Sequence, residues 1–266
     1  RVLDLSLHGE GLAASRLARD VAHRARQALA VADDEVAAHL VLAVVAASLL
    51  VHLLGGEGDL YGDLGRGREA PDLDVVVAEG QSVKAGEALF VDKKHPELKF
   101  VSPVSGTVAA VNRGARRKVM SIVVTPSAKQ EAVEFGAKSV HSLSGEQVKQ
   151  MLLESGMFAF LRQRPYDVVA NPDSTPKAIF VSAFDSKPLA PDFEYVIKGN
   201  EADFQAGLSA LAKMAPTYLG VSGKQTHLNI VDAKNVEINV FKGKHPAGNV
   251  GVQINHINPI NKGEIV

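Results

Sequence analysis

Residues 79–124 read EGQSVKAGEALFVDKKHPELKFVSPVSGTVAAVNRGARRKVMSIVV. In the first part of this stretch, Gly80, Val83, Gly86 and Leu89 recur every three residues, which suits tight turns between short buried strands. A Pro-Val-Ser-Gly turn signal separates two later apolar runs. The apolar runs, each bounded by Gly, Pro, Asn or charged residues, are 89–91, 100–101, 108–111 and 122–124. Short strands punctuated in this way predict a small, flattened β-barrel.

This pattern resembles the barrel-sandwich of biotinyl and lipoyl carrier domains. Lys93 and Lys94 lie where such a domain displays its modified lysine. However, Pro96 and the nine residues between Lys93 and Pro103 lengthen the hairpin beyond the tight turn of a carrier. We therefore expect residues 93–96 to form an exposed hairpin tip without covalent lipoate or biotin. The residues expected to share one barrel core are Phe90, Val101, Val108 and Ile122.

The composition limits the classes of function. The chain has 266 residues, enough for two domains, with 46% hydrophobic and 22% charged residues. A net charge of −1 gives no reason to expect a nucleic-acid partner. The absence of cysteine excludes disulfides, thiolate metal sites and cysteine catalysis. The nine histidines show no H-x-x-x-H spacing, so we expect no metal site, and no Ser/His/Asp order predicts a catalytic residue.

Residues 1–71 form an atypical segment rich in Ala and Arg. The first 70 residues contain no Lys, Ile, Asn, Thr, Phe, Met or Pro. Residues 36–54 carry no formal charge and are long enough for a membrane span, but they include His39 and His52 and lack aromatic anchors. We favour the interpretation that residues 10–70 are an out-of-frame reading of a GC-rich gene. A buried helix and a membrane anchor remain the alternatives.

The second half of the chain reads as α/β. Ser144 and Gln147 form a capping-box signature for a helix that stops near Gly156. A second helix is expected after Asn200, with Phe204, Leu208 and Leu211 on one stripe. The run 178–184, which is apolar apart from Ser182, is typical of a strand buried on both faces. The next strands are expected at 217–221 and 236–241, and this strand–helix–strand order implies a parallel sheet.

Several motifs are more specific than the architecture. They resemble the A subunit of the sodium-translocating NADH:quinone reductase, in the order found in that family, over roughly residues 74–266. The motifs are DKKHP at 92–96, PVSGT at 103–107, NRGARR at 112–117, LESG at 153–156, LRQRP at 161–165, DSTP at 173–176, AIFV at 178–181 and HPAG at 245–248.

The resemblance implies a fold and a function. The expected fold class is α/β with a small all-β module. A biotinyl/lipoyl-like barrel-sandwich would span 72–126, and an incomplete, truncated Rossmann-like parallel sheet would span 127–266. The complex of that family oxidises NADH, reduces ubiquinone and exports Na⁺, using flavins, iron centres and ubiquinone. This chain would be a peripheral subunit on the cytoplasmic face of the bacterial inner membrane. It would contribute to the quinone end and to assembly with the other subunits, without a cofactor or catalysis of its own.

Residues 153–165 occupy the place where a related flavin-binding subunit of respiratory complex I carries a glycine-rich phosphate loop. A phosphate cradle needs several glycines, and only Gly156 is present here, followed by bulky residues. We therefore expect a degenerate nucleotide fold. Arg162 and Arg164 in this segment are either structural pairing partners or residues of a quinone site or a subunit interface.

His245, Pro246 and Gly248 form a loop just after an expected strand. Ligands of open α/β sheets bind beyond strand carboxyl ends, so this loop is the other quinone or interface candidate, with a structural turn as the alternative. Two other function classes stay open. One is a membrane-associated barrel-sandwich adaptor anchored by residues 36–54, and the other is a flavin- or NADH-binding oxidoreductase.

Overall fold

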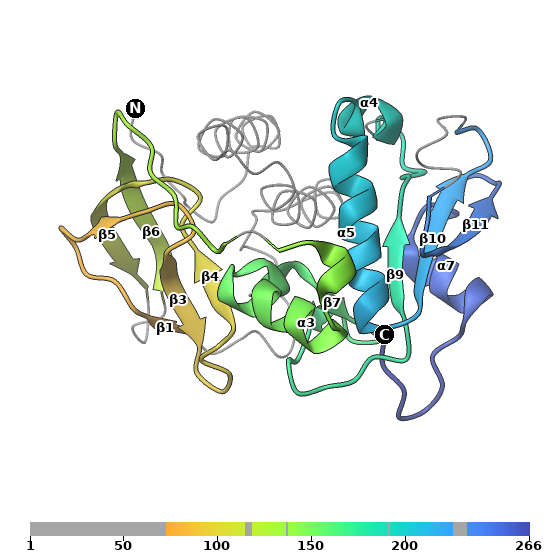
Figure 1. The fold of residues 1–266 in the computed structure, drawn as a ribbon, viewed down its shortest axis with the longest axis horizontal. Coiled ribbons are helices and arrows are strands. Elements are labelled where there is room, and N and C mark those ends of the chain that lie inside the picture. Colours follow the sequence, from red (N-terminus) through yellow and green to blue (C-terminus); the bar gives the residue numbers. More distant parts are fainter. Residues whose placement is uncertain (1–72, 115–118, 137, 191, 226–232) are drawn as a thin grey trace.

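The computed structural model describes residues 73–114, 119–136, 138–190, 192–225 and 233–266, which form a β-rich part followed by an α/β part (Figure 1). The expectations for residues 1–71, including the uncharged stretch 36–54, lie outside the described residues. Within the described ranges, no helix is both long enough and apolar enough to cross a membrane.

The β-rich part is built from two antiparallel sheets of three strands each. One sheet has the order β1-β3-β4 and the other β2-β5-β6. Between them lies a core that includes Val83, Leu89, Val108 and Val124, each no more than 3% exposed. The predicted barrel-sandwich is therefore confirmed. Its strands are β1 Leu73–Val75, β2 Ser82–Val83, β3 Ala88–Asp92, β4 Lys99–Val101, β5 Gly106–Arg113 and β6 Val119–Pro126.

The expected single barrel core is only partly correct. Val108 and Ile122 share the core between the two sheets. Val101 instead joins a different cluster, shared with the α/β part, and Phe90 is half-buried where the two clusters meet. Phe90 stacks on Phe100, with ring centroids 4.9 Å apart. The prediction for Val101 was wrong because strand alternation separates two faces but does not say what covers each of them.

The hairpin between β3 and β4 has an exposed tip, as expected. Lys93, Lys94 and Pro96 are exposed, whereas the His95 side chain is 22% exposed. The carboxylate of Asp92 accepts hydrogen bonds from the backbone N–H groups of Lys94 (2.8 Å) and His95 (2.9 Å). This Asx-type turn fixes the direction in which the tip residues leave the sheet.

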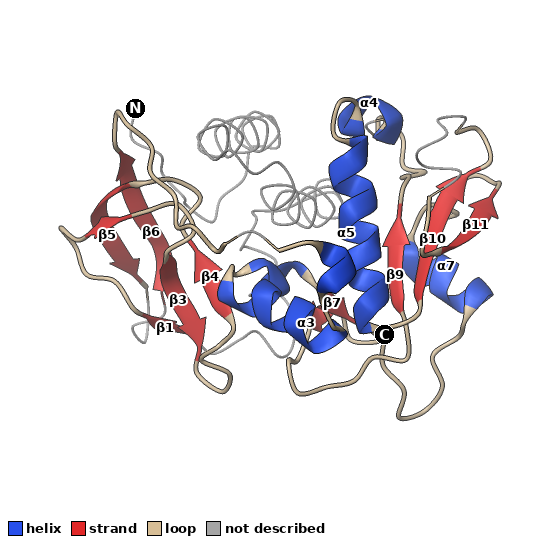
Figure 2. Ribbon diagram, viewed as in Figure 1, coloured by secondary structure: helices blue, strands red, loops and turns tan. Residues whose placement is uncertain are grey.

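The α/β part has a three-stranded parallel sheet with the order β11-β10-β9 (Figure 2). Leu219 and Val221 on β10 pack with α5, whereas a Cβ on Gly220 would lie 2.1 Å from the side chain of Gln253 on α7. Since adjacent strand residues point to opposite faces, α5 and α7 cover opposite faces of the sheet. The elements are η3 Val140–Ser142, α3 Gly145–Glu154, η4 Met157–Phe160, β7 Arg162–Gln163, β8 Val168–Val169, β9 Ile179–Ser182, α4 Phe193–Ile197, α5 Glu201–Met214, β10 Thr217–Ser222, β11 Glu237–Phe241 and α7 Val250–Ile257.

Local signals place most of these elements. The capping box of α3 is present: Ser144 Oγ accepts from the Gln147 N–H (3.2 Å), and Gln147 Oε1 accepts from the Ser144 N–H (2.9 Å). Gly156 follows the helix with a left-handed φ of 75°. Asn200 occupies the N-cap position of α5, although its side chain makes no capping hydrogen bond. The stripe on α5 is buried as expected, at Phe204, Leu208 and Leu211.

The run 178–184 contains the strand β9, at Ile179–Ser182, but this strand is not buried on both faces. In β9 only Val181 is buried, while Ile179, Phe180 and Ser182 are half-buried. The reason is topological, because β9 lies at the edge of the sheet and β10 takes the central place. In the part of the chain that the structure describes, no strand pairs with the outer edge of β9.

An apolar cluster joins the two parts of the molecule. Leu98, Phe100 and Val101 come from the barrel, and α3 and η4 supply the other side. Phe100 is 1% exposed and Phe158 is 4% exposed. Gly156 lies at this joint, where a Cβ would be 2.6 Å from Val101 Cγ1. The barrel is therefore packed against the α/β part through side chains as buried as those of a domain interior.

Candidate functional site

A cavity of 310 Å³ lies along the outer edge of β9. Its walls come from α3, η4, β7, β9, α5, α7 and the last two residues of the chain, and they are mostly apolar. Ile179 donates its N–H to Pro216 O, and Ala183 donates to Gly220 O. The alternation of a parallel ladder therefore directs the backbone amide of Phe180 away from β10 and towards this outer edge.

Arg162 and Arg164 both line this cavity. Each is paired with Asp167: Arg162 Nε and Arg164 Nη2 both lie 3.3 Å from Asp167 Oδ1. Arg162 also donates to the backbone carbonyl of Asp167. The side chains of Arg162 and Arg164 are 18% and 30% exposed. One carboxylate thus faces two guanidinium groups, which leaves an excess of one positive charge in this cluster. The lining of the cavity also holds Glu146 and Lys149, which pair with each other at 3.7 Å.

The last residues of the chain hold one end of the cavity. Arg164 N–H donates to Val266 O (2.8 Å), and Lys177 N–H donates to Ile265 O (2.8 Å). Lys177 Nζ forms an ion pair with Glu264 Oε2 at 2.8 Å. This hydrogen bond, with a second one from the Asn261 N–H at 2.9 Å, holds the pKa of the Glu264 carboxyl below its usual value of 4.5. No local pattern predicts this pair, because 87 positions separate its members.

Replacing Lys177 with methionine is expected to raise the pKa of Glu264 towards 4.5, since the largest cause of its lowering is removed. A lowered carboxyl pKa contributes stability above the unfolded-state pKa, and this contribution is lost as the pH falls through the folded-state value. The stability difference between the two proteins should therefore be largest near neutral pH and shrink in acid. A pH titration of Glu264 by NMR, with the neighbouring Lys262→Met as control, measures the shift; equal pKa values in all three proteins would contradict it.

The loop containing His245, Pro246 and Gly248 lies elsewhere on the α/β part. Ser186 Oγ is 3.2 Å from His245 Nδ1 and accepts the N–H of Gly248 at 2.8 Å. Ser186 follows β9 and the loop follows β11, so both lie beyond strand carboxyl ends, as expected. His245 and Pro246 are exposed. Gly248 is buried, and a Cβ there would lie 2.4 Å from the Ser186 backbone nitrogen, so Gly248 has a structural role.

The structure separates the predicted site residues into two groups. Arg162 and Arg164 lie beside the residues that precede β9. The Arg164 N–H donates to Val266 O, and the Lys177 N–H donates to the adjacent Ile265 O. His245, Pro246 and Gly248 lie with the residues that follow β9. The predicted site residues therefore lie at two separate locations and do not form one combined site.

The segment expected to be a degenerate phosphate loop is filled by its own side chains. Met157, Phe158 and Ala159 of η4 are no more than 8% exposed and belong to the cluster that joins the barrel to the α/β part. The backbone of Gly156 faces Val101 and Lys99 rather than an open cradle. A phosphate loop presents free N–H groups at a helix N-terminus, and this segment has a different geometry.

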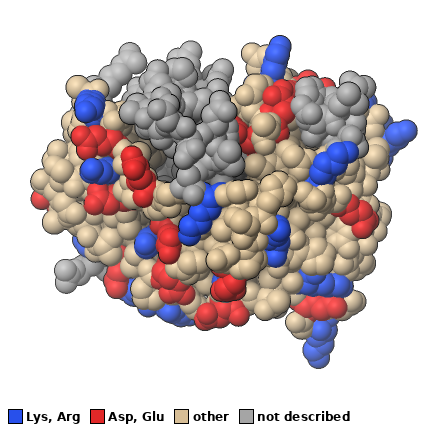
Figure 3. Space-filling model, in the orientation of Figure 1, with Lys and Arg blue, Asp and Glu red and all other residues tan. Residues whose placement is uncertain are grey.

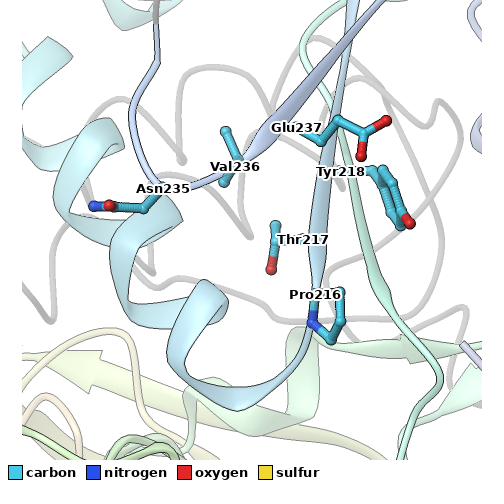
Figure 4. A pocket seen from close by; sticks show the side chains of 6 residues that line it. All are labelled: Pro216, Thr217, Tyr218, Asn235, Val236 and Glu237. Carbon is cyan, nitrogen blue, oxygen red and sulfur yellow. The ribbon is translucent and has the colours of Figure 1, made fainter.

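A second hollow, of 530 Å³, lies at the amino ends of β10 and β11 (Figure 4). Glu237 brings a negative charge to its lining, and Asn235 donates a hydrogen bond to Ser209 Oγ. The cavity beside β9 is smaller but combines apolar walls with cationic groups, and we therefore regard it as the candidate site.

Sequence reasoning missed one cluster of ligand-type side chains. His95 Nδ1 lies 3.6 Å from Glu97 Oε1 and 3.6 Å from Asp173 Oδ2. The search for regular histidine spacing could not find it, because one carboxylate comes from a loop far along the chain. The available signal was weaker: His95 and Asp173 both lie in the conspicuous motifs DKKHP and DSTP.

Two family models match the chain. The model described as "NqrA N-terminal barrel-sandwich hybrid domain" matches residues 69–127. The model described as "NqrA second alpha/beta domain" matches residues 143–266. Together they include both parts of the described structure and the cavity beside β9.

Curated relatives that are similar to the same region are each named as the A subunit of an Na(+)-translocating NADH-quinone reductase. The protein from Haemophilus influenzae strain Rd is 39% identical over 189 residues, and the one from Alcanivorax borkumensis is 40% identical over 188 residues. The protein from Actinobacillus pleuropneumoniae serotype 5b is 41% identical over 193 residues. Each alignment includes 69% of this chain and 42% of the relative. The chain thus spans less than half the length of these relatives.

Proposed function

This chain belongs to the NqrA family, and from that membership we propose that it acts as part of the A subunit of an Na⁺-translocating NADH-quinone reductase. In this proposal the complex oxidises NADH, reduces ubiquinone and exports Na⁺, and its other subunits are the partners of this chain. The chain lies peripherally, on the cytoplasmic face of the bacterial inner membrane. The flavins and iron centres belong to the other subunits.

The cavity beside β9 carries the proposal that the chain contributes to the quinone end. A quinone headgroup is a flat, largely apolar ring with two carbonyl oxygens that accept hydrogen bonds. The cavity offers aromatic and aliphatic walls, including Phe160, Phe180 and Ile254. Such a pocket, with a few convergent polar groups, is the usual form of a small-molecule site.

The arginines supply the polar part of this site. Arg162 donates through Nε to Asp167 Oδ1 and through Nη2 to the Asp167 backbone carbonyl, so its role is to stabilise the turn between β7 and β8. Arg164 contacts Asp167 through Nη2 and is more exposed. Arg164 is therefore the donor best able to turn to a quinone oxygen. The excess positive charge of the pair favours the negative charge that a quinone gains when it is reduced.

The loop with His245 and Pro246 serves a different purpose in this proposal, which is contact with another subunit. Lys242, Lys244, His245 and Pro246 are all exposed. On the face in Figure 3 acidic and basic side chains intermingle. A short basic loop would therefore recognise a local acidic patch on the partner subunit, and long-range electrostatic attraction between the two surfaces would contribute little. Gly248 and Ser186 hold the loop in place from below.

The isolated chain is expected not to oxidise NADH. The filled η4 segment offers no cradle for a dinucleotide phosphate, and the rival interpretation as a flavin or NADH oxidoreductase needs one. An absorbance spectrum of the purified chain and an NADH-oxidation assay test this. Flavin bands that persist through gel filtration, or NADH-dependent activity, would favour the rival. The membrane-adaptor alternative rests on residues 36–54, outside the described structure.

Replacing Arg164 with methionine in the full-length protein tests the quinone site. In the assembled complex, the KM for a soluble ubiquinone analogue is expected to rise about 10- to 100-fold, the value of a hydrogen bond to a charged donor. The KM for NADH should stay unchanged, because NADH does not bind in this cavity in the proposal. Arg164→Lys keeps a cation and should lose less.

His245→Ala is the matched control in the same complex. It removes an exposed ring at the other end of β9 and should leave the KM for quinone unchanged while weakening the association between subunits. Equal quinone KM values in the wild type and Arg164→Met, with unchanged thermal stability, would remove the cavity from the quinone site. An equal loss of activity and stability would return Arg164 to a structural role.

A further inference from the structure

Three ligand-type side chains meet at the joint between the barrel and the α/β part. His95 and Glu97 lie on the hairpin between β3 and β4, and Asp173 lies on the loop between β8 and β9. One nitrogen and two carboxylate oxygens from them lie within 4.8 Å of one another. The cluster lies outside the cavity beside β9, and nothing in the proposed function uses it.

The separations fit a metal coordination sphere. In a tetrahedral zinc site with bonds of about 2.0–2.1 Å, two ligand atoms lie about 3.4 Å apart. Here His95 Nδ1 is 3.6 Å from Glu97 Oε1 and 3.6 Å from Asp173 Oδ2. The two His95 separations therefore need shifts of only a few tenths of an ångström, whereas the two carboxylate oxygens, which lie within 4.8 Å of each other, can need a larger one. The side chains of Glu97 and Asp173 are 44% and 77% exposed, so they are free to make such shifts.

Backbone hydrogen bonds fix the loops that carry these donors. The His95 N–H donates to Asp92 Oδ1 at 2.9 Å, and the Leu98 N–H donates to His95 O at 2.8 Å. On the other loop, the Asp173 N–H donates to Asn171 Oδ1 at 2.8 Å. Both loops are ordered by contacts that do not involve the three donor atoms. Because the loops are already fixed, binding of an ion would order mainly the exposed side chains of Glu97 and Asp173 and not the backbone.

We propose that His95, Glu97 and Asp173 form a binding site for a divalent cation of the zinc class. An imidazole nitrogen with two carboxylate oxygens suits Zn²⁺, whereas Mg²⁺ and Ca²⁺ prefer oxygen ligands alone. Three protein donors leave one position for water. Without the metal, His95 Nδ1 lies between the two carboxylates, at 3.6 Å from an oxygen of each.

The ion would link the two parts of the chain at a second point, beside the apolar cluster of Phe100 and Phe158. Asp173 shares its loop with Asn171 and Ser174, which line the cavity beside β9. Metal binding on one side of this short loop therefore restrains the wall of the cavity on its other side. The site is structural in this proposal, and no step of the electron transfer passes through it.

Calorimetric titration of the whole 266-residue chain with Zn²⁺, after treatment with a chelator, tests the proposal. The chain has nine histidines, so a comparison of variants is needed to locate the ion. Asp173→Asn removes one charged ligand, and its matched control is Asp74→Asn, which makes the same change at a carboxylate paired with Lys93. His95→Ala is compared with His141→Ala, which removes an exposed histidine of η3.

One ion is expected to bind the wild type, Asp74→Asn and His141→Ala with similar affinity. In Asp173→Asn and His95→Ala the dissociation constant should rise more than about 10-fold, because loss of a ligand costs at least as much as loss of its supporting contacts. Co²⁺ as a second probe should give the visible absorption bands of a tetrahedral site in the wild type and lose them in these two variants. Equal Zn²⁺ affinities across all five proteins, or no binding at all, would overturn the proposal.

Discussion

Replacing Phe100 with alanine is expected to lower the free energy of unfolding by about 3–5 kcal/mol, the usual cost of removing a buried aromatic side chain. Phe100 is 1% exposed and stacks on Phe90 at a centroid distance of 4.9 Å. Its cluster contains residues of α3 and η4 as well as the barrel, so the cavity left behind lies between two packed layers that cannot easily collapse. Urea unfolding followed by circular dichroism measures the change.

Two other aromatic residues provide the comparison. Tyr166 is 83% exposed, so Tyr166→Ala should change stability by less than about 0.5 kcal/mol. Phe90 is half-buried, so the loss of stability in Phe90→Ala should fall between the losses in Phe100→Ala and Tyr166→Ala. If Phe100→Ala and Tyr166→Ala unfold at the same urea concentration, the joint between the barrel and the α/β part is not formed as described.

The second large effect is expected for Gly156→Ala, at about 2–5 kcal/mol. Two costs add at this position. The φ of 75° costs an L-residue about 1–2 kcal/mol, and overpacking costs typically about 1–3 kcal/mol. The overpacking arises because the new Cβ would lie 2.6 Å from Val101 Cγ1. Chemical denaturation gives the total.

Gly80→Ala separates the two costs. Gly80 has a similar φ of 83°, but nothing lies within 4 Å of its added Cβ, so it pays only the backbone cost. In addition, Val101→Ala removes the methyl group that would clash, so the double variant should be less destabilised than the sum of the two single variants. Additive effects, or equal effects at Gly80 and Gly156, would show that Val101 does not press on Gly156.

The sequence was sufficient where short-range chemistry decides the structure. Ser144 and Gln147 identify the start of α3 because a capping box needs two side chains three residues apart. The stripe of Phe204, Leu208 and Leu211 predicts α5 for the same reason, since helical periodicity is local. The short strands punctuated by turns predicted the barrel, and the strand–helix–strand order predicted the parallel sheet.

Long-range pairing limited the rest. The run 178–184 predicts a strand, but whether that strand is central or at an edge depends on partners that its own residues do not name. Val101 was assigned to the wrong core because the elements that cover it lie more than 40 positions later. Arg162 and Arg164 were correctly singled out as candidates for charge pairing, yet their shared partner Asp167 and their separation from His245 required the fold. The cluster of His95, Glu97 and Asp173 was likewise hidden by the distance along the chain.

The joint made by Phe100, Val101 and Gly156 bears on how this barrel can be used. A biotinyl or lipoyl carrier domain works as a swinging arm, which must leave one partner to visit the next. Here Phe100 and Val101 of β4 are buried against α3 and η4. Gly156 has no room for a methyl group beside Val101, so the two parts of the molecule approach each other closely at this point. This barrel-sandwich is instead packed in place, and because His95 lies on the hairpin that leads into β4, the contacts of Phe100 and Val101 tie the position of that hairpin to η4.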